Sequence, residues 1–310
     1  IDNTDFYPAK GKDRIRAMIE TRPDWCVSRQ RVWGVPLPIF ISKKTGEVLV
    51  DDNVFENIAK IYEKEGSDCW FNEDYQPFLG DKYRAEDYEK LSDIVEVWFD
   101  SGSTHSFVLE KRDDLKWPAS MYLEGSDQHR GWFHSSLLES CGTRGVAPFE
   151  SILSHGFVVD GKGLKMSKST GNVIAPQDIL KKYGADILRI WVASSNYAED
   201  LRIDYSILDQ HAESYRKIRN TFRYLLGNIQ DQYENLDFEK VNFENFDSLE
   251  KFMLHRIYVI NENFKNNFKI YNFHNLYKAL LNFCTVELSA FYFDIRKDTL
   301  YCEALNSNKR

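Results

Sequence analysis

The sequence lacks several features that would place a protein in a specialised class. It has no apolar run long enough to span a bilayer and no Cys-x-x-Cys pair. Its five cysteines are scattered, which argues against a structural zinc site and a disulfide framework and is typical of a reducing compartment. We therefore expect a soluble protein with no metal bound by its cysteines, which are Cys26, Cys69, Cys141, Cys284 and Cys302.

An excess of positive charge is also missing. The 310 residues carry a formal net charge of −8, the wrong sign for a protein coated in nucleic acid. This does not exclude RNA binding, because phosphate contacts need only a local basic face. With 43% hydrophobic and 28% charged residues, the composition is that of a globular protein, and the length suits two or three domains.

From Ile94 onward, short apolar runs alternate with stretches of helical spacing. This alternation predicts an α/β fold in which a parallel sheet is joined by crossover helices. We expect buried strands at 94–99, 120–123 and 151–159, with a helix at 131–141. Such a doubly wound fold binds its ligand at the carboxyl ends of the strands.

The rest of the chain is predicted to be helical. Pro176 and Gly184 bracket a short helix, and a second helix is expected at 186–193. Beyond residue 204, apolar side chains recur at three- and four-residue steps, which predicts long amphipathic helices. We interpret these apolar stripes as core packing and assign no ligand to them; they cover about 208–229, 249–268 and 276–295.

The most informative motif is Lys165-Met166-Ser167-Lys168-Ser169. Two lysines flank a short polar pair, directly after a strand-like run and a glycine-containing loop. A mobile cationic loop of this kind can close over a polyphosphate and neutralise charge as pyrophosphate departs. The alternative for the five residues alone is a solvated basic loop.

The surrounding runs strengthen the motif. Trp98 opens Trp-Phe-Asp-Ser-Gly-Ser, and Glu124 opens Glu-Gly-Ser-Asp-Gln-His-Arg-Gly-Trp. Further runs are Arg-Pro-Asp-Trp-Cys-Val-Ser-Arg-Gln-Arg from Arg22, His-Gly-Phe from His155 and Gly-Asn-Val from Gly171. Together they closely resemble the class I aminoacyl-tRNA synthetases, and within them the isoleucine branch. The order and spacing hold across nearly all of the chain.

The chain departs from the family in one respect. The family's His-Ile-Gly-His signature is absent, and the sequence opens on Ile1. The resemblance therefore implies an internal fragment of a longer enzyme, with the family's zinc cluster outside it. It also implies a domain order: the end of an editing-domain connector with the return strand (1–44), a small second insertion (45–92), the second half of a Rossmann-like catalytic domain (93–175), a helical junction (176–204) and an incomplete anticodon-binding bundle (205–310).

The resemblance implies a two-step reaction. Isoleucine attacks ATP, a substrate that comes with Mg²⁺, to give isoleucyl-adenylate and pyrophosphate, and the acyl group then passes to the 3′ end of tRNA(Ile). The implied partners are L-isoleucine, ATP and tRNA(Ile), with no membrane. The whole enzyme is expected to be cytoplasmic and monomeric. Positioning and charge stabilisation must supply most of the acceleration.

The resemblance also assigns site residues. Lys168, supported by Lys165, would meet the departing phosphates. The ribose of the adenylate would bind to the acidic turn Glu124-Gly125-Ser126-Asp127, while Gln128 would contact the substrate ammonium. His155 would lie near the adenine, more through its backbone than its ring. The alternative for the acidic turn is a simple link between strand and helix.

Trp98 and Trp132 would form the walls of the isoleucine pocket together with Gln128, although both could equally be core tryptophans. His129 could be a structural histidine or a ligand contact. The first long helix carries four basic residues, Arg216, Lys217, Arg219 and Arg223. A surface that faces the tRNA and a solvated basic face explain them about equally well.

Two rival interpretations remain. One is the valine or leucine branch of the same class, which the run from Glu124 to Trp132 disfavours. The other is a tRNA-binding relative without catalytic activity, which would have no need of an intact loop at 165–169.

Overall fold

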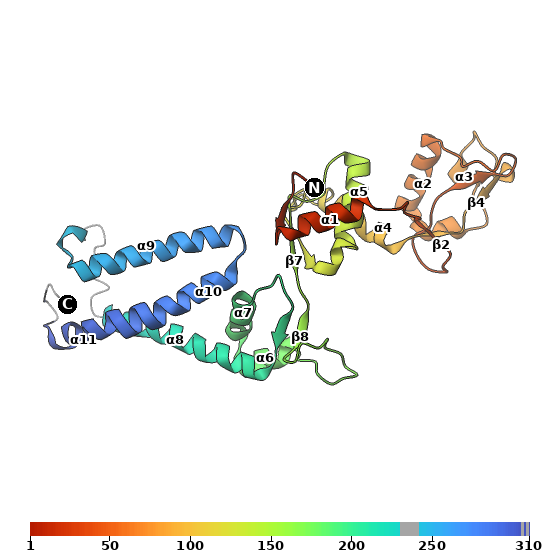
Figure 1. Ribbon diagram of the computed structural model, residues 1–310. Coiled ribbons are helices and arrows are strands. Elements are labelled where there is room, and N and C mark those ends of the chain that lie inside the picture. Colours follow the sequence, from red (N-terminus) through yellow and green to blue (C-terminus); the bar gives the residue numbers. More distant parts are fainter. Residues whose placement is uncertain (230–241, 305–306, 308–309) are drawn as a thin grey trace. The chain divides into compact units, whose positions relative to one another are not determined.

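The computed structural model describes residues 1–229, 242–304, 307 and 310, and the chain divides into two compact units (Figure 1). The N-terminal unit is Ile1–Ser154 and the C-terminal unit is His155–Arg310. The division falls within the predicted range 93–175. Of the predicted bundle, residues 230–241 lie outside the described residues.

A three-stranded sheet with the order β1-β7-β6 is the centre of the N-terminal unit. Its strands are β1 (Asp5–Tyr7), β7 (Ser151–His155) and β6 (Tyr122–Gly125), and β1 runs parallel to β7. Helices α1 (Lys10–Glu20) and α5 (Trp132–Arg144) accompany it (Figure 1). Side chains from all five elements share one core, which contains Phe6, Ile15, Tyr122, Phe133, Leu137, Phe149 and Ile152.

The opening residues are thus part of this core, although the resemblance implied only a connector and a return strand over residues 1–44. Helix α1 was not expected, and its Ile15 is completely buried. The predicted helix at 131–141 is confirmed and extends to Arg144. The strand expected at 120–123 is found two residues later, as β6.

The strand predicted at 94–99 is wrong beyond its second residue. Only Ile94–Val95 (β5) is extended, pairing antiparallel with β2 (Ser28–Arg29), and Val97–Gly102 forms helix α4. The reason is local: the carboxylate of Glu96 accepts a hydrogen bond of 3.1 Å from the backbone N–H of Trp98. This N-cap satisfies a donor that would otherwise be free in the first helical turn and starts a helix inside an apolar run.

The strand predicted at 151–159 is interrupted at Gly156. After β7 the chain continues as β8 (Val158–Asp160), which pairs parallel with β9 (Leu201–Ile203) in the C-terminal unit. The N–H of Gly156 donates to the carbonyl of Tyr197. An ideal Cβ at Gly156 would lie 2.3 Å from backbone atoms of Glu199, so only glycine fits this approach.

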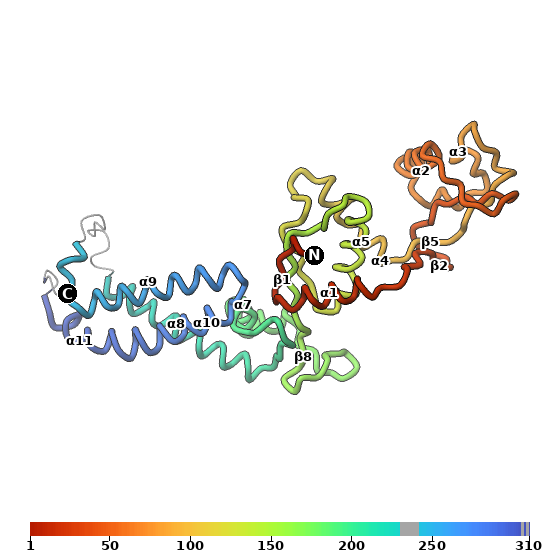
Figure 2. The backbone as a smooth tube through the Cα atoms, turned by 45° about the horizontal axis from the view of Figure 1, so that its top comes forward, coloured from red at the N-terminus to blue at the C-terminus, as the bar shows by residue number. Residues whose placement is uncertain are grey.

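The predicted insertion at 45–92 folds together with Phe40–Ser42 into a small substructure with a core of its own. Helix α2 (Asp52–Glu65) contacts α3 (Gln76–Leu79), and β3 (Phe40–Ser42) pairs antiparallel with β4 (Tyr88–Lys90). Figure 2 follows this segment as the orange part of the backbone. The completely buried Trp70 lies among Phe40, Val54, Ile58, Cys69, Phe78 and Leu79.

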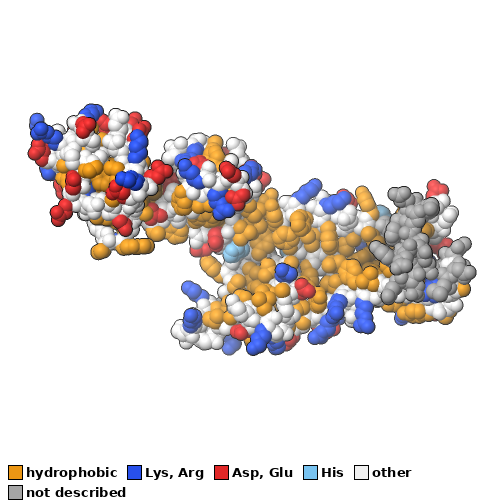
Figure 3. All heavy atoms as spheres, turned by 180° about the vertical axis from the view of Figure 1, so that it is seen from behind, with side chains coloured by type: hydrophobic (Ala, Val, Ile, Leu, Met, Phe, Trp, Pro, Cys, Tyr) orange, Lys and Arg blue, Asp and Glu red, His pale blue; other side chains and the backbone are white. Residues whose placement is uncertain are grey.

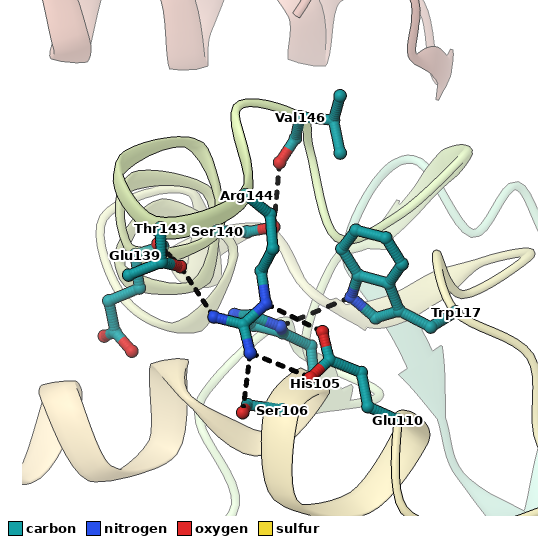
Figure 4. A network of polar contacts seen from close by, with 9 residues as sticks. All are labelled: His105, Ser106, Glu110, Trp117, Glu139, Ser140, Thr143, Arg144 and Val146. Atoms are coloured by element: carbon teal, nitrogen blue, oxygen red, sulfur yellow. Dashed lines mark hydrogen bonds and ion pairs between the residues drawn. The ribbon is translucent and has the colours of Figure 1, made fainter. Parts of the chain in front are cut away.

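A polar network ties the segment after α4 to the end of α5 (Figure 4). The Arg144 guanidinium donates to both carboxylate oxygens of Glu110, at 2.7 and 2.8 Å, and to the hydroxyl of Ser106 at 2.9 Å. Ser106 belongs to a π-helical turn, His105–Leu109, whose buried His105 accepts from the indole of Trp117 at 3.3 Å. Burial lowers the pKa of His105 and so favours its neutral, accepting form.

In the C-terminal unit, α6 (Pro176–Tyr183) and α7 (Ala185–Ser194) confirm the two predicted short helices. They pack with β9 and the first turns of α8 (Tyr205–Ile229) around Ile179, Ile187, Trp191, Leu201, Ile203 and Leu208. The second long helix, α9 (Ser248–Lys269), is also as predicted. The third consists of α10 (Phe273–Asn282), a π-helical stretch (Phe283–Tyr292) and α11 (Phe293–Cys302).

Hydrophobic side chains gather on the surface of this helical region (Figure 3). Those exposed on α8 and α9 include Phe222, Leu226, Ile257 and Tyr258. No helix in the described parts of the chain has the length and apolar character needed to cross a membrane. Likewise, within residues 1–229 and 242–304, no three His, Cys, Asp or Glu side chains form a group that could hold a metal ion.

Candidate active site

The acidic turn lies where β6 ends. Glu124 and Gly125 are its last residues, Ser126–His129 form a 3₁₀ turn, and α5 begins at Trp132. The side chains of Glu124 and Asp127 are exposed to solvent. Two carboxylates are therefore free to accept hydrogen bonds at the carboxyl end of a sheet strand, which is where a fold of this kind binds its ligand.

Gln128 is held in place by its own neighbours. Its side-chain oxygen accepts from the backbone N–H of Trp132 at 3.0 Å, and its amide nitrogen donates to Asp127 at 3.0 Å. The first contact caps α5, whose opening N–H groups lack partners within the helix. A substrate ammonium would therefore meet an oxygen that is fixed in position and already accepts one hydrogen bond.

His129 is a structural residue in this arrangement. It is 1% exposed, its Nδ1 lies 2.9 Å from the carbonyl of Ser126, and its ring meets Phe133 edge-on. Burial lowers its pKa, so the ring is neutral and Nδ1–H donates to Ser126. The buried Nε2 has no partner and faces Gly11, where an ideal Cβ would be only 2.9 Å away.

The three residues predicted for the amino-acid pocket meet around Gly131. An ideal Cβ there would lie 2.6 Å from the side-chain oxygen of Gln128 and 2.9 Å from the ring of Trp98. Trp98 is 42% exposed on α4, so it is a surface wall and not a core residue. Trp132 stacks on Tyr122 with ring centroids 4.0 Å apart, so it belongs partly to the core.

The indole of Trp132 also has polar contacts. Its N–H donates to the carbonyl of Ser101 at 3.0 Å and to the hydroxyl of Thr104 at 3.1 Å. Trp132 therefore connects α5 to the end of α4, the helix that carries Trp98, and its position relative to Trp98 is fixed.

Sequence reasoning missed a pair of carboxylates between α4 and α5. Burial, and secondarily the charge of Asp100, raises the pKa of Glu139 to about 8. Burial and the charge of Glu96 also raise the pKa of Asp100. One oxygen of Glu139 is buried without a hydrogen-bond partner, and it faces Gly102 so closely that an ideal Cβ there would be 2.1 Å away. The only sign of this pair in the sequence was Asp100, the carboxylate within Trp-Phe-Asp-Ser-Gly-Ser.

The motif loop at 165–169 belongs to the C-terminal unit. Lys165 and Lys168 are both exposed, and neither ammonium has a carboxylate partner among the described residues. An antiparallel bridge joins Val159 to Lys165, so the loop starts from the end of β8. Both lysines are therefore free to pair with a phosphate.

A residue outside the motif organises this loop. Asn172 accepts from the backbone N–H of Ser167 at 2.9 Å and donates to the carbonyl of Lys165 at 3.2 Å. It also donates to Asp160 at 2.9 Å and accepts from the hydroxyl of Thr170 at 2.8 Å. The hydrogen bond from Asn172 is the main reason that the pKa of Asp160 is lowered. The backbone of the motif is thus held while its lysine side chains stay free.

His155 ends β7 and is half-buried, with Nδ1 2.7 Å from the carbonyl of Gly156. The predicted site residues are therefore divided: the acidic turn and the tryptophans are in the N-terminal unit, and His155 with the lysine loop are in the C-terminal unit. Of these residues, Trp98 and Gln128 meet around Gly131, next to Trp132.

The predicted basic residues of α8 are all exposed. Arg216, Arg219 and Arg223 are spaced by three and four residues, which places them on one helix face. Arg216 is paired with Glu213 at 2.8 Å, so part of its charge is balanced within the helix. Lys217 borders a pocket in the bundle together with Asn220, Tyr224 and Lys297.

Comparisons with known proteins identify the family of the chain. Residues 1–204 match the family model of class I tRNA synthetases (I, L, M and V), and residues 250–309 match the anticodon-binding domain of tRNA ligases. The chain is 79% identical over its full length to the isoleucine–tRNA ligase of Pelagibacter ubique and 52% identical to that of Brucella abortus biovar 1. It covers 34% and 31% of these two proteins, so it spans about a third of their length.

Solved structures share the fold at low sequence identity. One is the methionyl-tRNA synthetase of Mycobacterium tuberculosis bound by methionyl-adenylate, with a TM-score of 0.66 and 15% sequence identity. The alignment covers 98% of this chain and 51% of the synthetase chain. Another is a leucyl-tRNA synthetase of Agrobacterium radiobacter K84 in a ternary complex with tRNA, with a TM-score of 0.60 and 16% sequence identity. The alignment covers 89% of this chain and 38% of the synthetase chain. With the family model matching about two thirds of its residues, this chain belongs to the class I tRNA synthetases of the isoleucine, leucine, methionine and valine group.

Proposed function

We propose that the protein containing this chain is an isoleucine–tRNA ligase, which activates isoleucine with ATP and transfers it to the 3′ end of tRNA(Ile). The observation that carries the proposal is 79% identity, over all 310 residues, to a protein of that name. The matching stretch includes the intact Lys165–Ser169 loop and the run from Glu124 to Trp132. ATP with Mg²⁺ and L-isoleucine are the proposed small substrates.

The proposed roles are those that the family resemblance implies, and the charges and exposure of the side chains are consistent with them. Lys168, with Lys165, stabilises the negative charge that moves onto pyrophosphate as it leaves. The exposed carboxylates of Glu124 and Asp127, with the backbone of Gly125, bind the ribose of the adenylate. His155 lies near the adenine and contributes more through its backbone than its ring, of which Nδ1 is already engaged with the Gly156 carbonyl.

The amino-acid pocket is proposed to consist of Trp98, Gln128 and Trp132, around Gly131. Rigid aromatic walls suit a branched aliphatic side chain, and the fixed oxygen of Gln128 suits an ammonium group. Arg216, Lys217, Arg219 and Arg223 are proposed to face the tRNA, where exposed basic side chains pair with phosphates. We further propose a monomeric, cytoplasmic protein, and that the zinc cluster known in the family lies outside these 310 residues.

The test is isoleucine-dependent exchange of labelled pyrophosphate into ATP by the full-length protein. Isoleucine should support exchange about 100-fold better than valine, since one methylene is worth roughly 1–3 kcal/mol; this family's choice between the two amino acids is itself the standard illustration of that limit. Leucine should be a poor substrate. Exchange that prefers valine or leucine would move the protein to another branch, and no exchange would favour a tRNA-binding relative without catalytic activity.

The 310 residues alone should give no exchange. They correspond to about a third of the related ligases, and the His-Ile-Gly-His signature does not occur in them. Clear activity from this chain would contradict the proposal that the catalytic fold needs residues outside it.

A further inference from the structure

A pocket of about 410 Å³ lies in the N-terminal unit, between the end of α1 and the start of α5. Its lining includes Met18, Arg22, Asp24, Trp25, Arg130 and His134, none of which has a role in the proposed activation chemistry. The volume is in the range of small-molecule sites. Two guanidinium groups and one carboxylate leave the lining with a net positive charge.

Arg22 is held in position without an acidic partner. Its guanidinium lies 5.0 Å from the ring centroid of Trp25, a cation–π contact, and one of its terminal nitrogens lies 3.2 Å from Nε2 of His134. His134 is 5% exposed, and burial, followed by the charges of Arg22 and Arg130, lowers its pKa. The neutral ring accepts from Arg22, which leaves most of the five guanidinium donors free.

Arg130 supplies a second free guanidinium. Among the described residues, neither Arg22 nor Arg130 forms a salt bridge, whereas Arg144 in the same unit is fully paired with Glu110. Both guanidinium groups line the same pocket, so they repel each other unless an anion lies between them. Their planar forks match the oxygens of a phosphate, to which they can donate in pairs.

We propose that this pocket binds a phosphate group carried by a nucleotide. Arg22 and Arg130 donate to the phosphate oxygens, and the apolar surface of Met18 and Trp25 receives the adjoining sugar or base. Asp24 at the pocket edge disfavours a second phosphate beside the first, because like charges repel. The nucleotide is either a unit of a single-stranded RNA or a free mononucleotide, and both present the same chemistry to the pocket.

The test uses the ring signals of His134 in nuclear magnetic resonance spectra of the full-length protein, assigned with His134→Gln. Inorganic phosphate, AMP and a single-stranded hexa-adenylate are titrated separately. Each should shift the His134 signals to saturation, because an anion beside the two guanidinium groups changes the field at the ring. A hexa-adenylate that binds at least tenfold more tightly than AMP identifies an RNA strand, and equal affinities identify a free nucleotide.

Matched variants make the test specific. Arg130→Gln should weaken the binding of all three probes at least tenfold, since charge-assisted hydrogen bonds are the stronger class. Arg84→Gln, which removes the same charge from an exposed position, should leave binding within twofold. Because Arg130 is exposed, its loss leaves the core intact. Unmoved His134 signals, or unchanged affinity in Arg130→Gln, would overturn this proposal and leave the proposed ligase activity untouched.

Discussion

The side-chain amide of Asn172 donates a hydrogen bond of 2.9 Å to the carboxylate of Asp160, which ends β8. The same carboxylate accepts from the backbone N–H groups of Lys162 and Leu164, at 3.0 and 2.8 Å. The strand end, the glycine loop and the motif loop are thereby joined through two side chains. These hydrogen bonds fix the backbone of the loop that carries Lys165 and Lys168.

Removing the amide should loosen the loop. In Asn172→Ala, the backbone N–H of Ser167 and the carbonyl of Lys165 lose their partners, each at a cost of about 0.5–1.5 kcal/mol. We expect faster hydrogen–deuterium exchange over residues 162–170, and an increase in the Michaelis constant for ATP of about tenfold, since that energy converts to roughly this factor. Asn220→Ala, an exposed position on α8, is the control; equal exchange rates in both variants would contradict the role of Asn172.

Lys168→Ala should lower isoleucine-dependent pyrophosphate exchange by about 100- to 1000-fold, the usual cost of losing one preorganised donor to developing charge. Isoleucine binding without ATP should barely change. Lys162→Ala, which removes an exposed lysine from the preceding loop, should stay within a few-fold of the parent. If both lysine variants are equally active, Lys168 is not the catalytic cation.

Glu124→Gln tests the assignment of the acidic turn to the ribose. The substitution keeps the shape but replaces a charged acceptor by a neutral one, so a non-hydrolysable isoleucyl-adenylate analogue should bind about 1–2 kcal/mol more weakly. Calorimetry should show free isoleucine unaffected, and circular dichroism an intact fold. Glu89→Gln on β4 serves as the control. An equal loss for both ligands would assign Glu124 to the amino-acid pocket or to the scaffold.

The buried carboxylate of Glu139 predicts a pH dependence of stability. Its pKa is raised to about 8 in the folded state, mainly by burial, from an ordinary value near 4.5. The folded state therefore binds the proton more tightly, and its stability is lost as the pH rises from about 4.5 to about 8. Glu139→Gln should flatten the melting temperature over that window. A parallel decline in both proteins would show that another group is responsible.

Two glycines of the C-terminal unit should respond oppositely to alanine. Gly156→Ala places a Cβ 2.3 Å from the backbone of Glu199 and should destabilise the unit by about 1–3 kcal/mol, as overpacking does. Gly227→Ala, in the last turn of α8 with open space around it, should stabilise by at most about 0.5–1 kcal/mol. Denaturant titration measures both, and a harmless Gly156→Ala would mean that the backbone there can shift.

The elements that sequence reasoning placed correctly are those with local signals. Helix α6 begins at Pro176 and ends before Gly184, and both residues act through their own backbone preferences. The long helices α8 and α9 follow from periodicity alone. The π-helical stretch from Phe283 to Tyr292 was not predictable, because an apolar pattern does not show whether a backbone N–H donates to the fourth or the fifth residue before it.

The misplaced elements depend on contacts that a sequence pattern does not contain. Val97, Trp98 and Phe99 have a high strand preference, yet the Glu96 cap makes them helical. In the candidate site, the acidic turn and the lysine loop were predicted because their motifs are contiguous. Asn172 and the pair Asp100–Glu139 were missed as functional partners, since their significance lies in neighbours distant in sequence.

The pairing of β1 with β7 sets the order in which the N-terminal unit can form. Asp5 lies opposite Ser151, so the sheet closes only after nearly the whole unit has been synthesised. Loop closure over such a distance costs entropy before any contact offsets it, which makes this step slow. The segment around Trp70 has a core of its own and can fold earlier. Within residues 1–154, β1 can therefore pair with β7 only late in synthesis, after the segment around Trp70 has been made.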